Sequence, residues 1–221
     1  MSDAAVDTAF EANESLRQDA AAALRDLVHA FVGHECDDAS LVALREWAQQ
    51  QTDALDAGTA RSRVLLMQRA LAAAGPGQWT PGGGAGFEDR AVAGRTNPTG
   101  IVFDSWREGD AMLADITLGA AFEGAPGRAH GGIVAAAFDD FTGAIIGMLQ
   151  EPAFTGELTV RFVQPVPVRT PLRLRTWLES RDGRKLHIHA DAHAGETLVA
   201  TCKAIYITVD PLRFADAPDP R

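Results

Sequence analysis

Apolar residues recur every three or four positions through the first quarter of the chain. The first set is Leu24, Leu27, Val28 and Phe31, and the second is Leu41, Leu44, Trp47 and Ala48. Side chains at this spacing lie on one face of an α-helix. The pattern therefore predicts amphipathic helices from about residue 9 onwards.

Residues that favour helix ends separate these predicted helices. Gly33 is expected to end the first helix, and Asp37, Asp38 or Ser40 to cap the second. A third helical stretch is predicted for residues 60–74. The Gly- and Pro-rich stretch after it lacks the strand and the Lys-Ser or Lys-Thr pair that a phosphate-binding loop needs, so we expect it to be a connector.

The second half of the chain alternates apolar and polar residues, which is typical of strands with one buried face. Residues 101–103 and 111–118 are predicted to form two strands around a turn at Gly109. Further alternating segments cover residues 158–162, 172–175, 186–191 and 199–207. Asp182-Gly183 and Ala194-Gly195 are expected to form hairpin turns between them.

A long apolar segment, residues 131–149, interrupts these strands. Its only charged residues are Asp139 and Asp140. A helix that is apolar nearly all round belongs in the middle of a fold. Two strands, one buried helix and a run of antiparallel strands form an α+β layout. We expect the sheet to wrap around this helix, since nothing else in this half of the chain could cover it.

Composition narrows the possible partners. The 221 residues suffice for one domain, with or without an extension, and the net charge is −10. Such a surface repels phosphate backbones, so we do not expect nucleic-acid binding. The charge does not exclude a small phosphorylated ligand, because a few Arg or Lys residues at one mouth would suffice to bind it.

Neither a targeting signal nor a cysteine motif points to a particular compartment or to a metal. No run of about 18 apolar residues predicts a membrane span, and residues 1–5 lack the basic region of a secretory signal. We therefore expect a cytoplasmic protein. Cys36 and Cys202 fit neither a disulfide framework nor a metal knuckle, and we expect two reduced thiols.

The loop and start of the apolar helix carry a more specific motif. The run EGAPGRAHGGIVAAAFDDFTG, residues 123–143, places Asp139 nine positions after His130 of a His-Gly-Gly sequence. The segments that follow it, residues 155–162 and Pro165-Val166-Pro167, fit a strand with a proline-containing exit. These features resemble PaaI-like hotdog-fold acyl-CoA thioesterases over about residues 97–210.

The resemblance implies an α+β hotdog fold, in which an antiparallel sheet wraps a central helix. It divides the chain into a helical N-terminal extension with its connector at residues 1–95, a hotdog thioesterase domain at 96–212 and a tail at 213–221. The implied activity is hydrolysis of acyl-CoA thioesters, without a metal or redox cofactor. Two alternatives stay open: a non-catalytic acyl-CoA-binding or regulatory module, and a hotdog hydratase or dehydratase.

The motif also suggests roles for individual residues. A helix N-terminus presents free backbone N–H groups, so Gly131 and Gly132 could stabilise an oxyanion. Asp139 is the candidate general base or nucleophile. The resemblance implies that Thr155 places a hydroxyl near this acid, and that His130 shapes the loop or the thioester pocket.

Each assignment has a structural alternative. The two glycines could form a tight turn without a ligand. Asp139 could be a buried carboxylate satisfied by Thr142 or a backbone donor, with Asp140 facing the substrate instead. His130 and Thr155 could have purely structural roles. The resemblance is also incomplete, because Val163-Gln164 stand where the family often has basic residues.

The spacing of the candidate residues predicts an oligomer. Gly131 and Asp139 are eight residues apart, or about 12 Å along a helix at about 1.5 Å per residue. One thioester carbonyl cannot contact both ends of that span. If both residues act on it, one must come from a neighbouring subunit, so we expect a homodimer or a dimer of dimers.

Two further groups of polar residues have simpler interpretations. One comprises alternate residues of a predicted strand, namely His187, His189, Asp191 and His193; we expect the outer face of the sheet rather than a metal site. The other comprises the basic residues Arg161, Arg169, Arg173, Arg175, Arg184 and Lys185. Some of them could contact coenzyme A, but the default expectation is a solvated sheet face.

Overall fold

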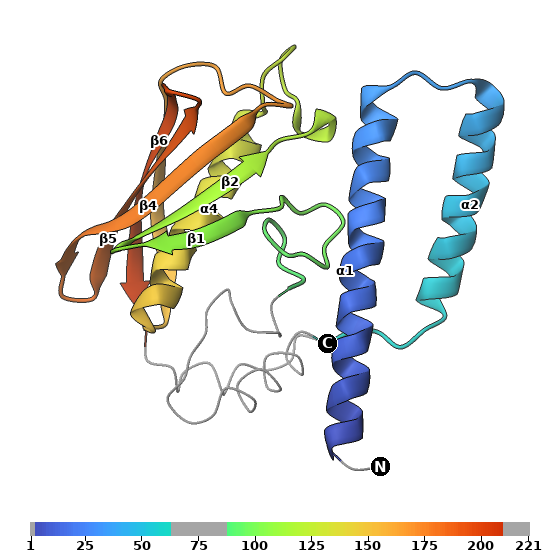
Figure 1. Cartoon of the computed structure of the whole chain (residues 1–221), viewed down its shortest axis with the longest axis horizontal. Helices are drawn as coiled ribbons and strands as arrows, with labels where there is room; N and C mark the ends of the chain where they lie inside the picture. Colours follow the sequence, from blue (N-terminus) through green and yellow to red (C-terminus); the bar gives the residue numbers. More distant parts are fainter. Residues whose placement is uncertain (1–2, 63–87, 210–221) are drawn as a thin grey trace.

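The computed structural model describes residues 3–62 and 88–209, which form a helical hairpin beside a sheet that encloses one helix (Figure 1). The helices are α1 (Asp3–Gly33), α2 (Asp38–Asp56) and α4 (Gly131–Leu149), with a short 3-10 helix, η1 (Ala120–Phe122). The strands are β1 (Asp104–Glu108), β2 (Ala111–Thr117), β3 (Ala153–Phe162), β4 (Pro171–Asp182), β5 (Lys185–Ala194) and β6 (Thr197–Thr208).

The six strands form one antiparallel sheet in the order β1-β2-β4-β5-β6-β3. Alternation along β5 puts Leu186, Ile188, Ala190 and Ala192 in the core. The predicted turns at Gly183 and Gly195 are confirmed, and both glycines adopt positive φ (55° and 57°), which a side chain would disfavour.

Helix α4 is the central helix that the sequence predicts. Its buried residues are Val134, Ala137, Phe138, Phe141, Thr142, Ile145 and Ile146. They join the inward side chains of the sheet in a single core. By length and composition, α4 is also the one helix within residues 3–62 and 88–209 that could cross a membrane. A buried core helix passes the same test, so length and composition alone are weak evidence for a membrane span.

Some boundaries differ from the predicted ones. The first helix starts at Asp3 rather than near residue 9, but ends at Gly33 as expected, and Asp37 caps α2 by accepting a hydrogen bond from the Ser40 N–H at 2.8 Å. The prediction of a strand at residues 101–103 is wrong. Ile101 is buried, but its N–H donates to the Val92 carbonyl in the preceding turns, so it does not pair with β2.

The third predicted helical stretch, residues 60–74, lies mostly outside the described residues. Its described part, residues 60–62, is not helical.

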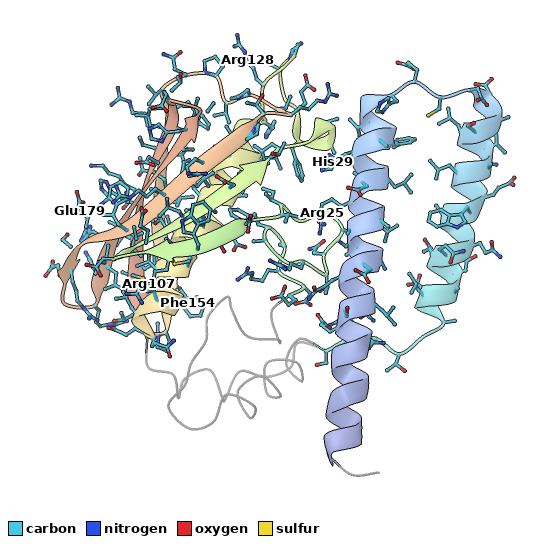
Figure 2. The ribbon with its side chains drawn as sticks, viewed as in Figure 1. Arg25, His29, Arg107, Arg128, Phe154 and Glu179 are labelled. Carbon is cyan, nitrogen blue, oxygen red and sulfur yellow. The ribbon has the colours of Figure 1, made fainter. Side chains whose placement is uncertain are left out.

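Helix α1 contacts the loops of the sheet domain through two polar side chains, which both lie on the side facing the domain (Figure 2). Arg25 donates hydrogen bonds to the carbonyls of Gly100 (2.8 Å) and Asn97 (2.9 Å). The His29 Nδ1 accepts a hydrogen bond from the Ala121 N–H at 3.1 Å. These contacts fix α1 beside the loop that leads to α4.

Candidate active site

The Asp139 carboxylate is exposed on α4, although seven residues of that helix are buried in the core. The Thr155 hydroxyl, on edge strand β3, donates a hydrogen bond to Asp139 Oδ1 at 2.9 Å. The structure thus brings together the acid and the hydroxyl that the resemblance pairs. The alternative that Asp139 is a buried carboxylate is wrong.

A buried pair of hydroxyls supports the helix turn that carries Asp139. The Tyr206 hydroxyl donates to the Asp139 backbone carbonyl at 2.9 Å, and Thr142 Oγ1 lies 3.0 Å from the Tyr206 oxygen. Burial raises the pKa of Tyr206, so it stays protonated as a donor. Thr142 therefore contacts the backbone of this turn rather than the carboxylate. No motif in the sequence distinguishes Tyr206, although it is the only tyrosine of the chain and stands in an alternating strand.

The carboxylate of the adjacent acid, Asp140, contacts Arg90 and Ala93 in the segment before β1. It lies 3.7 Å from the Arg90 guanidinium and accepts a hydrogen bond from the Ala93 N–H at 3.2 Å. Burial raises the pKa of Asp140, and Arg90 and the Ala93 N–H oppose that shift. Asp140 thus holds the segment that precedes the domain, which leaves Asp139 as the carboxylate available to a ligand.

His130 is the N-cap of α4. Its Nδ1 accepts a hydrogen bond from the Gly132 N–H at 3.1 Å, so a neutral imidazole carries its proton on Nε2. Within the described residues, no hydrogen bond is donated by the Gly131 N–H. The two glycine N–H groups are therefore not equivalent: Gly132 is occupied by the cap, and Gly131 is free to bind an oxyanion.

The free Gly131 N–H lies at a shallow depression of about 360 Å³. Phe162 and Val163 contribute apolar surface there, and Arg128 contributes a cation. A Cβ added to Gly131 would lie 3.3 Å from the Phe162 ring, so even a methyl group is tight at this position. The absence of a side chain leaves the backbone accessible beside an aromatic ring.

The histidine-bearing face of β5 is outside the core, as expected. His189 Nε2 lies 2.9 Å from Glu179, and His193 Nδ1 lies 3.5 Å from Asp191. Burial raises the pKa of Asp191, and His193 opposes the shift. Across residues 3–62 and 88–209, no three His, Cys, Asp or Glu side chains are placed to hold a metal.

Several of the basic residues considered for coenzyme A have protein partners instead. Arg173 forms a bidentate pair with Asp115, and Arg184 donates to the Thr208 carbonyl at 3.0 Å. The Arg175 guanidinium lies 5.2 Å from the Trp177 ring centroid. These contacts favour the default expectation of a surface role for these three residues.

The family comparison agrees with this architecture. Residues 126–206 match the thioesterase superfamily model. The crystal structure of a thioesterase superfamily protein aligns with a TM-score of 0.69 at 22% identity, covering 86% of this chain and 90% of that one. The fold is therefore a hotdog fold, and residues 126–206 are similar to the thioesterase superfamily.

Curated relatives of the hotdog domain are acyl-coenzyme A thioesterases. The THEM4 protein of Mus musculus is 28% identical over 95 residues, which cover 42% of this chain and 41% of that protein. The THEM4 protein of Xenopus laevis is 30% identical over 102 residues, which cover 45% and 46% of the two chains. The similarity thus spans less than half the length of either relative.

Proposed function

We propose that this protein hydrolyses acyl-CoA thioesters to a free acid and coenzyme A, as a PaaI-like member of the superfamily. The observation that carries the proposal is the exposed Asp139 carboxylate, held by Thr155 on the apolar helix that supplies part of the core. A charge on such a helix is costly unless it is solvated or functional. The similarity to acyl-CoA thioesterases supports the same chemistry.

The chemistry needs one carboxylate and one oxyanion donor. A water oxygen attacks the thioester carbonyl carbon while Asp139 accepts the water proton. The Gly131 N–H stabilises the oxyanion, and collapse of the tetrahedral intermediate breaks the C–S bond. The leaving thiolate then takes the proton from Asp139. Direct attack by Asp139, with an anhydride intermediate that water hydrolyses, uses the same two groups.

The arrangement also supports a dimer. Asp139 and Gly131 are two turns apart on α4, and strand β3 beside them forms one edge of the sheet in the described part of the chain. The edge and its exit expose Phe154 (55%), Phe162 (50%) and Val163 (41%). Exposed apolar side chains on a sheet edge favour association. We therefore propose that a two-fold homodimer brings Asp139 of one subunit to Gly131 of the other.

The first test measures coenzyme A release from short, medium and long acyl-CoAs by wild type and Asp139→Asn. Removing a general base predicts a loss of about 10²-fold or more. Asp140→Asn is the matched control, and it should retain activity because Asp140 faces Arg90. Normal turnover by Asp139→Asn would show that another group acts as the general base. Binding of acyl-CoA by the wild type without release would favour a non-catalytic binding module.

The second test asks whether the site lies between subunits. Gly131→Pro removes the proposed oxyanion donor at a helix position that tolerates proline, while Gly131→Ala keeps the N–H. Co-expressed Asp139→Asn and Gly131→Pro subunits should recover about a quarter of wild-type sites, because mixed dimers hold one intact site. No recovery in mixed dimers would contradict a shared site, and an active monomer in sedimentation would contradict the dimer itself.

A further inference from the structure

A cavity of about 650 Å³ opens beside Asp139, between α4 and edge strand β1. Its apolar lining includes Phe103, Met112, Phe141, Gly143, Gly147 and Met148. The Phe103 and Phe141 rings stack there with centroids 5.8 Å apart. The proposed chemistry uses Asp139 at one side of this cavity but does not explain the rest of the space.

The helix wall of the cavity has an unusual composition. Asp139, Gly143 and Gly147 follow one another at four-residue intervals, so they form one strip along α4. Each glycine in a helix interior costs about 1 kcal/mol relative to alanine. A helix that carries two of them on the strip leading from Asp139 keeps that strip free of side chains.

Two other lining residues are methionines with adaptable side chains. Met112 comes from β2, across the cavity from the helix, and Met148 comes from α4 itself. Methionine fills irregular space and accommodates flexible apolar ligands. On another side, the pair of Arg90 with Asp140 borders the cavity and keeps the second carboxylate engaged. The apolar strip is therefore adjacent to one available acid, Asp139.

We infer that this cavity binds the acyl chain of the substrate, and that Gly143 and Gly147 set the chain length. The inference rests on the proposed function. The strip from Asp139 to Gly147 runs about 12 Å along the helix, roughly the length of an extended chain of eight to ten carbons. The preferred substrate is thus a medium-chain aliphatic acyl-CoA. Each methylene buried along the strip is worth roughly four-fold in binding.

The test is the dependence of kcat/KM on chain length, from acetyl-CoA to palmitoyl-CoA. Wild type should be most active at about eight to ten carbons, at least roughly 10²-fold above acetyl-CoA even if only about half of the added methylenes are fully buried. Gly147→Leu should lower activity on decanoyl-CoA at least ten-fold while leaving acetyl-CoA within about two-fold. Gly143→Leu, one turn nearer the acid, should shift the optimum to still shorter chains, and Gly147→Ala should have an intermediate effect.

Equal losses at all chain lengths, or a wild-type preference for acetyl-CoA, would overturn the inference. Titration calorimetry with decanoyl-CoA and free coenzyme A separates it from the catalytic proposal. Weaker decanoyl-CoA binding by Gly147→Leu, with unchanged coenzyme A binding, supports the acyl site even if no variant releases coenzyme A. Identical affinities of wild type and Gly147→Leu for decanoyl-CoA would reject it.

Discussion

The sheet domain and the helical hairpin both contain helices with apolar side chains, but the burial of these side chains is very different. In α4, Phe138 is 1% exposed, whereas Phe31 of α1 is 52% exposed and α2 has no buried residue. The sheet covers α4 along its length (Figure 1). An apolar stripe thus specifies which face of a helix avoids water, but a packed core also needs a second surface that fits it.

The hairpin is attached mainly by polar contacts rather than by an apolar core. Arg25 and His29 of α1 bond to backbone groups of the domain. Between α1 and α2 lies a groove of about 530 Å³, lined by residues including Leu24, Phe31, Leu41 and Trp47. We therefore expect substitutions in the two regions to differ strongly in their effect on stability.

The largest difference is expected for matched phenylalanine substitutions. Phe138→Ala should lower the free energy of unfolding by about 3–5 kcal/mol, because it empties part of a closed core. Phe31→Ala should change it by no more than about 0.5 kcal/mol, since that ring is half exposed. Urea unfolding followed by circular dichroism measures both. Similar losses would show that the hairpin side chain is covered in solution.

A smaller effect is expected where the two regions meet. A Cβ on Gly119 would lie 2.5 Å from the His29 ring. Gly119→Ala should therefore displace α1, costing about 1–3 kcal/mol, and accelerate hydrogen exchange at Ala121. The double variant with His29→Ala removes the ring and should recover most of the strain. If the double variant is no more stable than Gly119→Ala, the loss of stability does not come from a clash with the His29 ring.

The smallest effect is expected for the pH dependence of stability that arises from His29, where the two regions meet. Burial lowers the pKa of His29 from 6.5, Asp26 opposes the shift and Arg25 adds to it. The unfolded chain then takes up a proton at a higher pH than the folded protein. This contribution to stability is complete above about pH 6.5 and is lost as pH falls through the lowered pKa. Protonated Nδ1 also cannot accept the Ala121 N–H.

Urea midpoints between pH 7.5 and 5 measure this contribution. His29→Asn keeps an acceptor without a titrating group, so it should show a weaker pH dependence than wild type. An identical pH dependence in both proteins would assign the titration to another residue.

Local patterns in the sequence predicted the regular elements well. The apolar segment became α4, and the turn sequences at Gly183 and Gly195 became hairpins. The misplaced strand at residues 101–103 shows the limit of that reasoning. A short apolar run such as that around Ile101 reads the same in a strand and in a buried loop, and only the hydrogen bond to Val92 distinguishes them.

For the site, the sequence by itself determined the residue types and their spacing. The His-Gly-Gly sequence marked the start of α4, and Asp139 followed within the same helix, because periodicity and caps are encoded by neighbouring residues. The spacing also predicted that one subunit cannot place both groups on one carbonyl.

Only the tertiary structure decided which of two similar groups is available. Asp139 and Asp140 are adjacent in sequence, yet Arg90 and Ala93 engage Asp140, and Thr155 holds Asp139 at the surface. The burial of Tyr206 beneath the same turn was equally invisible in the local pattern. The partners of these carboxylates come from segments distant in the chain, and folding brings them together through burial of the shared core.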